Sequence, residues 1–306
     1  MRVHLGPDHD EHLAAAIVEG GGTLVPLHEA EALVWHGDVD GFPELPAGVR
    51  WVQLVFAGIE PFFRAGIIDP DRIWTNASGV YADNVAEYAV GALLVGLRQF
   101  HGSIAAAARP VQRWQKPVLD PQVRMLHGST VAIVGCGGIG RAMIPRLRAL
   151  GVDVVAVNYS GRPVEGASVT FPASRTAEVW TMADHFVVAA PATADTDRLV
   201  NAEALDAMPD TAWLVNVARG NLVDSDALVD ALRGGKIAGA VLDVTDPEPL
   251  PDDHLLWTFD NVVITPHVAN TRTGLNATLA PTVRENVARF IAGEQLIALV
   301  DPAAGY

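Results

Sequence analysis

Three closely spaced glycines constrain the fold of this chain more than any other feature. The stretch STVAIVGCGGIGRAM, residues 129–143, places Gly135, Gly137 and Gly140 in the spacing G-x-G-x-x-G. An apolar run precedes them and a helix-like stretch begins at Ile139, which is the setting of a dinucleotide-binding turn. Gly135 would permit the tight turn, Gly137 the approach of a pyrophosphate, and Gly140 close packing of helix on strand. The alternative is a strand–turn–helix corner that binds no ligand.

The residues around this motif predict a parallel sheet. Helix-like stretches at 141–150, 201–208 and 225–233 alternate with short, fully apolar runs. Apolar strands that alternate with helices indicate a parallel sheet covered on both faces. We therefore expect an α/β Rossmann-type, doubly wound sheet, with strands at 131–134, 152–157, 186–190, 213–217, 238–242 and 262–265.

The first hundred residues carry weaker strand signals, at 2–5, 32–36 and 51–55, and predict a smaller, flavodoxin-like α/β substrate domain. One long helix is expected over 83–108, with Asp83 as N-cap and Pro110 as a stop. Another is expected over 278–293, with Gly293 at its C-terminal end. Its apolar face would carry Val283, Val287, Phe290 and Ile291. We predict a substrate domain of residues 1–98 and 278–306, a dinucleotide-binding domain of residues 99–277, and a cleft between them.

Charge and cysteine content exclude several classes of protein. The formal net charge is −15, which disfavours nucleic acid and anionic membranes as partners. A single cysteine, Cys136, cannot form a disulfide within the chain. No apolar run is long enough to span a bilayer, and the first residues lack the apolar core of a signal peptide. No His, Cys, Asp and Glu cluster has metal-ligand spacing. We therefore expect a cytoplasmic protein without a metal site.

The end of the strand expected at 152–157 bears on the choice of dinucleotide. An NAD site places Asp or Glu about 20 residues after the glycines, on the ribose 2′-hydroxyl. Here that position is Asn158, which would not repel a 2′-phosphate, and Ser160 and Arg162 follow as donors. The sequence therefore predicts a preference for NADP(H), with NAD(H) as a possible cofactor. The alternative is that residues 160–162 form an ordinary solvated turn.

Three segments at the ends of later strands each offer one reactive side chain: Arg219 in WLVNVARGNLVD, Glu248 in AVLDVTDPEPLP and His267 in VVITPHVAN. Hydride reduction of a ketone needs a separate proton donor, and histidine suits that role near neutral pH. A carboxylate on the other ring nitrogen would orient the imidazole, and an arginine fork would clamp a substrate carboxylate. Each residue alone would more often be structural. Because all three occur in successive strand-end loops after a dinucleotide motif, a joint catalytic role is the favoured interpretation.

These motifs resemble the D-isomer-specific 2-hydroxyacid dehydrogenase family, from about Asn76 onward. The resemblance implies that Arg219, Glu248 and His267 are catalytic and that Arg219 and His267 also bind substrate. It implies backbone contacts to the substrate carboxylate from Ala57 and Gly58, although residues 56–60 depart from the usual Gly-Val-Asp ending. Members of the family are commonly homodimers that pair through the dinucleotide domain. The implied cofactor contacts, together with the three glycines, Ser160 and Arg162, are Gly138, Ile139, Asn158, Ala190, Pro191, Val217, Ala218 and Asp243.

The resulting expectation is an NAD(P)-dependent oxidoreductase that prefers NADPH. It would interconvert a small 2-oxo acid and its D-2-hydroxy acid, with glyoxylate and hydroxypyruvate as leading candidates. Oxidation of a D-3-phosphoglycerate-type substrate is one alternative. A non-catalytic, dinucleotide-sensing interaction protein is another, because the fold alone does not decide function.

Overall fold

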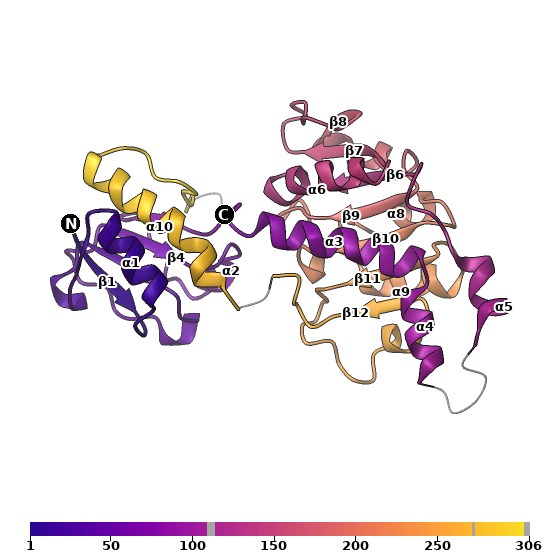
Figure 1. Cartoon of the computed structure of the whole chain (residues 1–306), viewed down its shortest axis with the longest axis horizontal. Coiled ribbons are helices and arrows are strands. Elements are labelled where there is room, and N and C mark those ends of the chain that lie inside the picture. Colours follow the sequence, from indigo (N-terminus) through magenta and orange to yellow (C-terminus); the bar gives the residue numbers. More distant parts are fainter. Residues whose placement is uncertain (109–113, 271–272, 303–306) are drawn as a thin grey trace. The chain divides into compact units, whose positions relative to one another are not determined.

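The computed structural model of the chain describes residues 1–108, 114–270 and 273–302, and it consists of two compact units (Figure 1). One unit is Met1–Tyr81 together with Thr271–Tyr306, and the other is Ala82–Asn270. Each unit is built on a parallel sheet with helices on both faces. The predicted α/β fold class is therefore confirmed.

The second unit contains a seven-stranded sheet in the order β12-β11-β10-β9-β6-β7-β8. Every neighbouring pair is parallel, and Val134 of β6 lies in register with Val188 of β9. The chain builds outward from β6 to β8 and then returns to build the other way from β9. This reversal between β6 and β9 is the switch point of a Rossmann-type sheet. The strands are β6 (Thr130–Val134), β7 (Asp153–Asn158), β8 (Val169–Pro172), β9 (His185–Val188), β10 (Trp213–Asn216), β11 (Gly239–Leu242) and β12 (Val262–Ile264).

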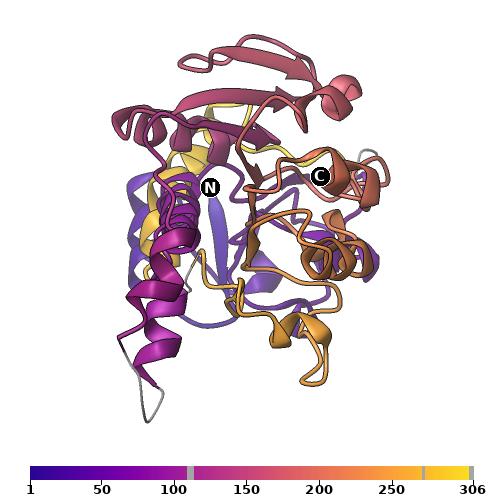
Figure 2. The ribbon, with the colours of Figure 1, turned by 90° about the vertical axis from the view of Figure 1, so that its right-hand side faces the viewer.

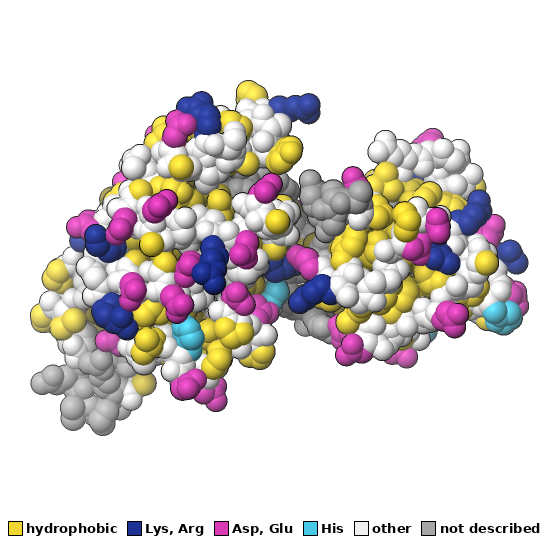
Figure 3. Space-filling view, turned by 180° about the vertical axis from the view of Figure 1, so that it is seen from behind, with side chains coloured by type: hydrophobic (Ala, Val, Ile, Leu, Met, Phe, Trp, Pro, Cys, Tyr) yellow, Lys and Arg dark blue, Asp and Glu magenta, His cyan; other side chains and the backbone are white. Residues whose placement is uncertain are grey.

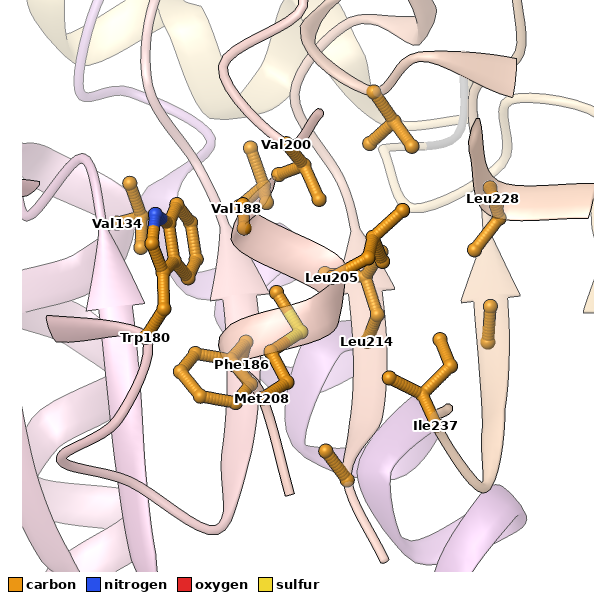
Figure 4. Packing of buried hydrophobic residues seen from close by; sticks show 14 of the residues in the cluster. Val134, Trp180, Phe186, Val188, Val200, Leu205, Met208, Leu214, Leu228 and Ile237 are labelled. Atoms are coloured by element: carbon orange, nitrogen blue, oxygen red, sulfur yellow. The ribbon is translucent and has the colours of Figure 1, made fainter. Parts of the chain in front are cut away.

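Helices cover both faces of this sheet because its strands are apolar on both sides. Along β6, Val131 and Ile133 face the core beneath α3 (Ala82–Leu97) and α6 (Gly138–Ala149), whereas Ala132 and Val134 face the opposite core. Figure 4 shows that opposite core, where Trp180 lies 5.5 Å from Phe186, measured between ring centres. The helices on that side are α7 (Thr176–Val179), α8 (Ala202–Ala207) and α9 (Ser225–Arg233).

The first unit has a five-stranded parallel sheet in the order β2-β1-β3-β4-β5, which is the flavodoxin-like order. Helices α1 (Glu11–Glu19) and α10 (Leu275–Ala292) lie side by side on one face (Figure 1). The other face is covered in part by α2 (Glu60–Arg64). The strands are β1 (Arg2–Gly6), β2 (Thr23–Leu24), β3 (Ala32–Trp35), β4 (Trp51–Leu54) and β5 (Ile73–Thr75).

The helix expected over 83–108 is two helices, α3 and α4 (Phe100–Ala107). The break lies at Gln99, which takes a left-handed φ of 56° and donates its side-chain amide to the carbonyl of Gly96. Asp83 lies inside the first turn rather than at the cap, and its carboxylate pairs with Arg146 at 2.8 Å. The expected stop at Pro110 lies outside the described residues.

The helix expected over 278–293 is α10, which begins three residues earlier, at Leu275, and ends at Ala292, with Gly293 as its predicted C-terminal cap in a left-handed conformation (φ 71°). Val283 and Val287 are buried, but Ile291 is 51 % exposed and does not belong to the buried face. A further short helix, α5 (Lys116–Leu119), follows α4 and belongs to the second unit.

The unit boundaries fall at 81/82 and 270/271, whereas the sequence placed the domain boundaries at 98/99 and 277/278. Helix α3 belongs to the second unit because it packs along α6 and beneath β10. Gly96 of α3 fits against the Trp213 ring so closely that a Cβ would lie 2.3 Å from it. This packing contact joins segments far apart in the chain, so periodicity does not reveal it.

The surface carries the chain's negative charge. On the face shown in Figure 3, acidic side chains are scattered over both units, and the basic side chains are dispersed among them. None of the described helices is both long and apolar enough to cross a membrane.

His185, at the start of β9, makes the stability of the second unit depend on pH. Its side chain is 4 % exposed, and Nδ1 accepts a hydrogen bond from the backbone N–H of Trp213. Burial lowers the pKa of His185 to about 4. An unfolded chain takes up a proton at histidine below about pH 6.5, whereas the native imidazole stays neutral. Stability is therefore expected to fall as the pH drops from 6.5 toward 4.

Urea unfolding at pH 7 and pH 4.5 measures this contribution, with His185→Gln as reference. Between these two pH values the unaltered protein should lose about 2–3 kcal/mol more stability than the variant. Equal losses would show that His185 protonates as easily in the native state as in the unfolded chain.

Candidate active site

The glycine loop connects β6 to α6, and each glycine has a separate structural reason. Gly135 has a φ of 98°, and a Cβ there would lie 2.2 Å from the backbone nitrogen of Ala190. At Gly140 a Cβ would lie 2.8 Å from Cys136 Sγ, so the helix could not pack as close to the strand. At Gly137 a Cβ would meet no atom within 4 Å. The loop thus leaves open space beside the N-terminus of a twelve-residue helix, where backbone N–H groups favour an anion.

Cys136 packs inside this loop and is 2 % exposed. Burial raises the pKa of its thiol to about 11. The side chain therefore fills space under α6 as a neutral thiol and has no reactive thiolate character.

The turn after β7 is organised by Asn158. Its Oδ1 accepts from the N–H of Gly161 at 2.6 Å, and its Nδ2 donates to the carbonyl of Arg162 at 2.8 Å. Ser160 Oγ accepts from the N–H of Arg162 at 3.3 Å. The Arg162 side chain is exposed, and among the described residues no carboxylate pairs with its guanidinium. The turn therefore presents the guanidinium of Arg162 near the uncharged side chain of Asn158.

Asn216, the last residue of β10, shapes the loop that presents Arg219. This buried side chain accepts from the N–H of Ala218 at 3.0 Å and donates to the carbonyl of Arg219 at 2.9 Å. Gly220 follows, and a Cβ there would lie 1.9 Å from the carbonyl atoms of Thr245. The backbones of the loops after β10 and β11 are therefore in contact at Thr245, three residues before Glu248.

Glu248 and His267 form a hydrogen-bonded pair. Glu248 Oε1 lies 2.7 Å from His267 Nδ1, and both side chains are nearly half exposed. His267 has a φ of 53°, and its N–H donates to the carbonyls of Asp243 and Thr265 at 2.9 Å each. A non-glycine residue in this conformation persists only where its surroundings hold it, and such residues concentrate at functional sites. With Nδ1 bound to the carboxylate, Nε2 is the ring nitrogen left for a substrate.

Asp243, predicted as a cofactor contact, is 2 % exposed at the end of β11. Both of its carboxylate oxygens accept hydrogen bonds from residues 265–269. Its structural role is therefore to hold the segment that carries His267, and contact with a cofactor stays a prediction.

All of the predicted site residues in the second unit follow the carboxyl ends of its strands. The glycine loop follows β6 and Asn158 ends β7, while Ala190 and Pro191 follow β9. Because parallel strands end at one edge, these segments gather at the edge where such sheets bind ligands. The remaining members are Ser160 and Arg162 after β7, Val217, Ala218 and Arg219 after β10, Asp243 and Glu248 after β11, and His267 after β12.

The predicted substrate loop lies in the first unit, after β4. Asn76, buried at the end of β5, donates from Nδ2 to the carbonyl of Ala57 at 2.9 Å, and the N–H of Ala77 donates to Phe56. Among the described residues, no group of three or more His, Cys, Asp or Glu side chains is arranged to hold a metal ion.

Four polar residues that organise these loops were missed from the sequence: Asn76, Asn216, Thr265, whose hydroxyl donates to Asp243, and Tyr88 of α3, whose hydroxyl bonds to that of Thr265. For Asn216 a signal existed, because an amide ends an otherwise apolar strand directly before a candidate catalytic arginine. The others have no local signal, since their partners lie far away in the chain.

Comparisons with known proteins identify relatives of this chain. The model of the D-isomer specific 2-hydroxyacid dehydrogenase NAD-binding domain matches residues 90–269, close to the bounds of the second unit. A protein of Corynebacterium melassecola, described as an uncharacterized protein in the proB 3′ region, is 45 % identical over 295 residues and covers 95 % of both chains. Glyoxylate reductase of Thermofilum pendens is 36 % identical over 235 residues, 74 % of this chain and 67 % of that one.

The fold also matches a solved structure over its whole length. The crystal structure of a D-isomer specific 2-hydroxyacid dehydrogenase from Xanthobacter autotrophicus Py2, in complex with NADPH and MES, superposes with a TM-score of 0.80. It is 26 % identical in sequence, and the match covers 100 % of this chain and 99 % of that one.

Proposed function

Because the chain belongs to the D-isomer-specific 2-hydroxyacid dehydrogenase family, whose members are nicotinamide-dinucleotide-dependent oxidoreductases, we propose that it reduces a small 2-oxo acid to its D-2-hydroxy acid with NADPH. Glyoxylate and hydroxypyruvate are the leading substrates. The observation that carries the proposal is the Glu248–His267 pair, 2.7 Å apart, at the sheet edge where the glycine loop also lies.

The glycine loop fits a dinucleotide pyrophosphate, because the space beside Gly137 is open and α6 begins there. When bound, the dinucleotide supplies the hydride. Gly135 and Gly140 keep the loop tight, and the backbone of Ala190, which follows β9, borders it. The other residues proposed to hold the cofactor are Gly138, Ile139, Asn158, Ser160, Arg162, Pro191, Val217, Ala218 and Asp243.

His267 is the proposed proton donor to the carbonyl oxygen of the substrate. Its Nε2 carries the transferable proton, while Glu248 binds Nδ1 and orients the ring.

Arg219 is the proposed clamp for the substrate carboxylate, with its planar fork of donors. Asn216 and Gly220 set the loop that presents it. The backbone N–H groups near Ala57 and Gly58 are proposed to contact the same carboxylate.

The direct test mixes purified protein with NADPH and a panel of 2-oxo acids and follows absorbance at 340 nm. Turnover of glyoxylate or hydroxypyruvate is expected. Tight NADPH binding without turnover of any acid would instead support a dinucleotide sensor, and turnover only of a phosphorylated acid would support a phosphoglycerate-type enzyme.

The turn after β7 leads to a prediction about cofactor preference. Replacing Arg162 with glutamine should lower kcat/KM with NADPH about tenfold and leave that with NADH unchanged, because a charge-assisted bond to the 2′-phosphate is lost. Asn158→Asp should also lower kcat/KM with NADPH, because the new carboxylate would repel the 2′-phosphate. The measurement is the ratio of kcat/KM for the two cofactors. If the unaltered protein used NADH as well as NADPH, the preference would be refuted.

A homodimer is proposed from the exposed apolar side chains of the segment of the second unit that contains α4 and α5, whose ribbon is drawn in Figures 1 and 2. Ile104 is 73 % exposed and Trp114 is 85 % exposed. Large apolar side chains that are exposed together along one segment are typical of protein–protein contact sites. The other exposed apolar residues of this segment are Phe100, Val118 and Met125.

Light scattering should give about 65 kDa for the native protein, twice the 32.4 kDa of one chain. Ile104→Glu should shift the mass toward that of one chain. Val18→Glu changes an exposed apolar residue of α1 in the first unit, and should leave the mass unchanged. A native mass of one chain would refute the homodimer.

The cytoplasmic location expected from the sequence stays a prediction.

A further inference from the structure

The segment that carries His267 is fastened to one buried carboxylate. Asp243 Oδ1 accepts from the hydroxyl of Thr265 at 2.7 Å and from the N–H of Val268 at 2.9 Å, while Oδ2 accepts from the N–H of Ala269 at 2.8 Å. The backbone carbonyl of Asp243 accepts from the N–H of His267. The residues on both sides of the imidazole are therefore held by a single side chain.

The hydroxyl of Thr265 connects this carboxylate to helix α3. A carboxylate only accepts hydrogen bonds, so Thr265 must donate to Asp243 and is left to accept from the hydroxyl of Tyr88. Burial raises the pKa of Tyr88, and the Asp243 charge raises it further, so the phenol keeps the proton that it donates. The three side chains form a chain of hydrogen bonds with one direction, from Tyr88 through Thr265 to Asp243.

His267 depends on this chain because its backbone is in a strained, left-handed conformation. A positive φ is uncommon for a non-glycine residue, although histidine adopts it more readily than most, so the bonds to Asp243 are needed to keep the backbone at 53° and the side chain aligned with Glu248. We infer that Thr265 and Tyr88 are positioning residues for the proposed reaction, which act by holding Asp243 and thereby the imidazole of His267. This inference rests on the proposed function, in which His267 donates the proton.

The principal test removes the Thr265 hydroxyl without changing side-chain shape. Thr265→Val should lower kcat about tenfold to a hundredfold, because a small misplacement of a catalytic group is costly, and should change KM for NADPH by no more than about twofold. Thr265→Ser keeps the hydroxyl and should restore kcat. Tyr88→Phe should lower kcat less, about threefold to tenfold, because Asp243 retains its three donors.

The matched control is Thr176→Val. Thr176 is 6 % exposed, and its hydroxyl donates to the carbonyl of Ala173 at 2.7 Å. It begins α7, which packs on β8, at the opposite edge of the sheet from β12. This variant should keep the kcat of the unaltered protein. Equal losses of activity in Thr176→Val and Thr265→Val would mean that only general stability matters, and would overturn the inference.

A second readout needs neither cofactor nor activity. The imidazole cross-peak of His267 in a ¹⁵N-histidine spectrum, assigned by its absence from His267→Asn, should shift in Thr265→Val and Tyr88→Phe but not in Thr176→Val. If Thr265→Val left both the cross-peak and kcat unchanged, the positioning role would be refuted and the proposed function would stand. If Thr265→Val does not fold, the same result in Tyr88→Phe would have this meaning. An unaltered protein that reduces no 2-oxo acid would refute the proposed function, while the cross-peaks would still test the positioning role.

Discussion

Replacing His267 with asparagine is expected to lower kcat for 2-oxo acid reduction by about 10²–10⁴-fold, the usual contribution of a positioned general acid. Asparagine tolerates the left-handed φ of this position, so the backbone should be preserved. The dissociation constant for NADPH should be unchanged, because the proposed pyrophosphate site is the glycine loop. Stopped-flow kinetics and fluorescence titration with NADPH measure the two quantities.

Two further variants show whether the loss comes from the proton donor. Glu248→Gln keeps a hydrogen bond to His267 Nδ1 but removes the negative charge beside the imidazole, so its kcat should fall, but by less than that of His267→Asn. His28→Asn changes an exposed histidine of the first unit, paired with Glu29, and should have no effect. An unchanged kcat in His267→Asn would remove this residue from the mechanism.

Replacing Gly220 with alanine is expected to cost at least about 3 kcal/mol of stability and to abolish activity. The added Cβ would lie 1.9 Å from the carbonyl carbon and oxygen of Thr245 and 2.5 Å from the nitrogen of Asp246. These are backbone atoms, so relief requires the loops after β10 and β11 to separate, which displaces both Arg219 and Glu248. Urea unfolding and the 340 nm assay measure the two effects.

Two other glycines provide controls for this variant. Gly91 lies in α3, where a Cβ would meet nothing within 4 Å, and Gly91→Ala should be neutral or stabilising by up to about 1 kcal/mol. Gly137→Ala likewise meets no atom, so it should fold but weaken NADPH binding if the pyrophosphate lies beside this residue. A stable and active Gly220→Ala would show that the two loops are not held against each other.

The fold was largely predictable because its signals are local. The glycine spacing between β6 and α6, and the alternation of apolar runs with helices, follow from how a parallel sheet is buried. The predictions failed where a distant contact overrides a local pattern. A left-handed residue at Gln99 divides the expected long helix, and the packing of Gly96 on Trp213 places α3 in the second unit. Strand β8 was missed because its residues are only partly buried and therefore lack a continuous apolar run.

Within the candidate site, the available side chains and the sheet edge at which they stand could be predicted from local motifs, because parallel strands end together and the motifs follow those ends. Which of these side chains meet depends on the folded arrangement of the loops. The pairing of Glu248 with His267, the contact of Gly220 with Thr245, and the chain from Tyr88 through Thr265 to Asp243 all join different loops or elements. Such contacts depend on strand register and helix packing, which bring together residues as far apart as 88 and 265, and no local pattern encodes them.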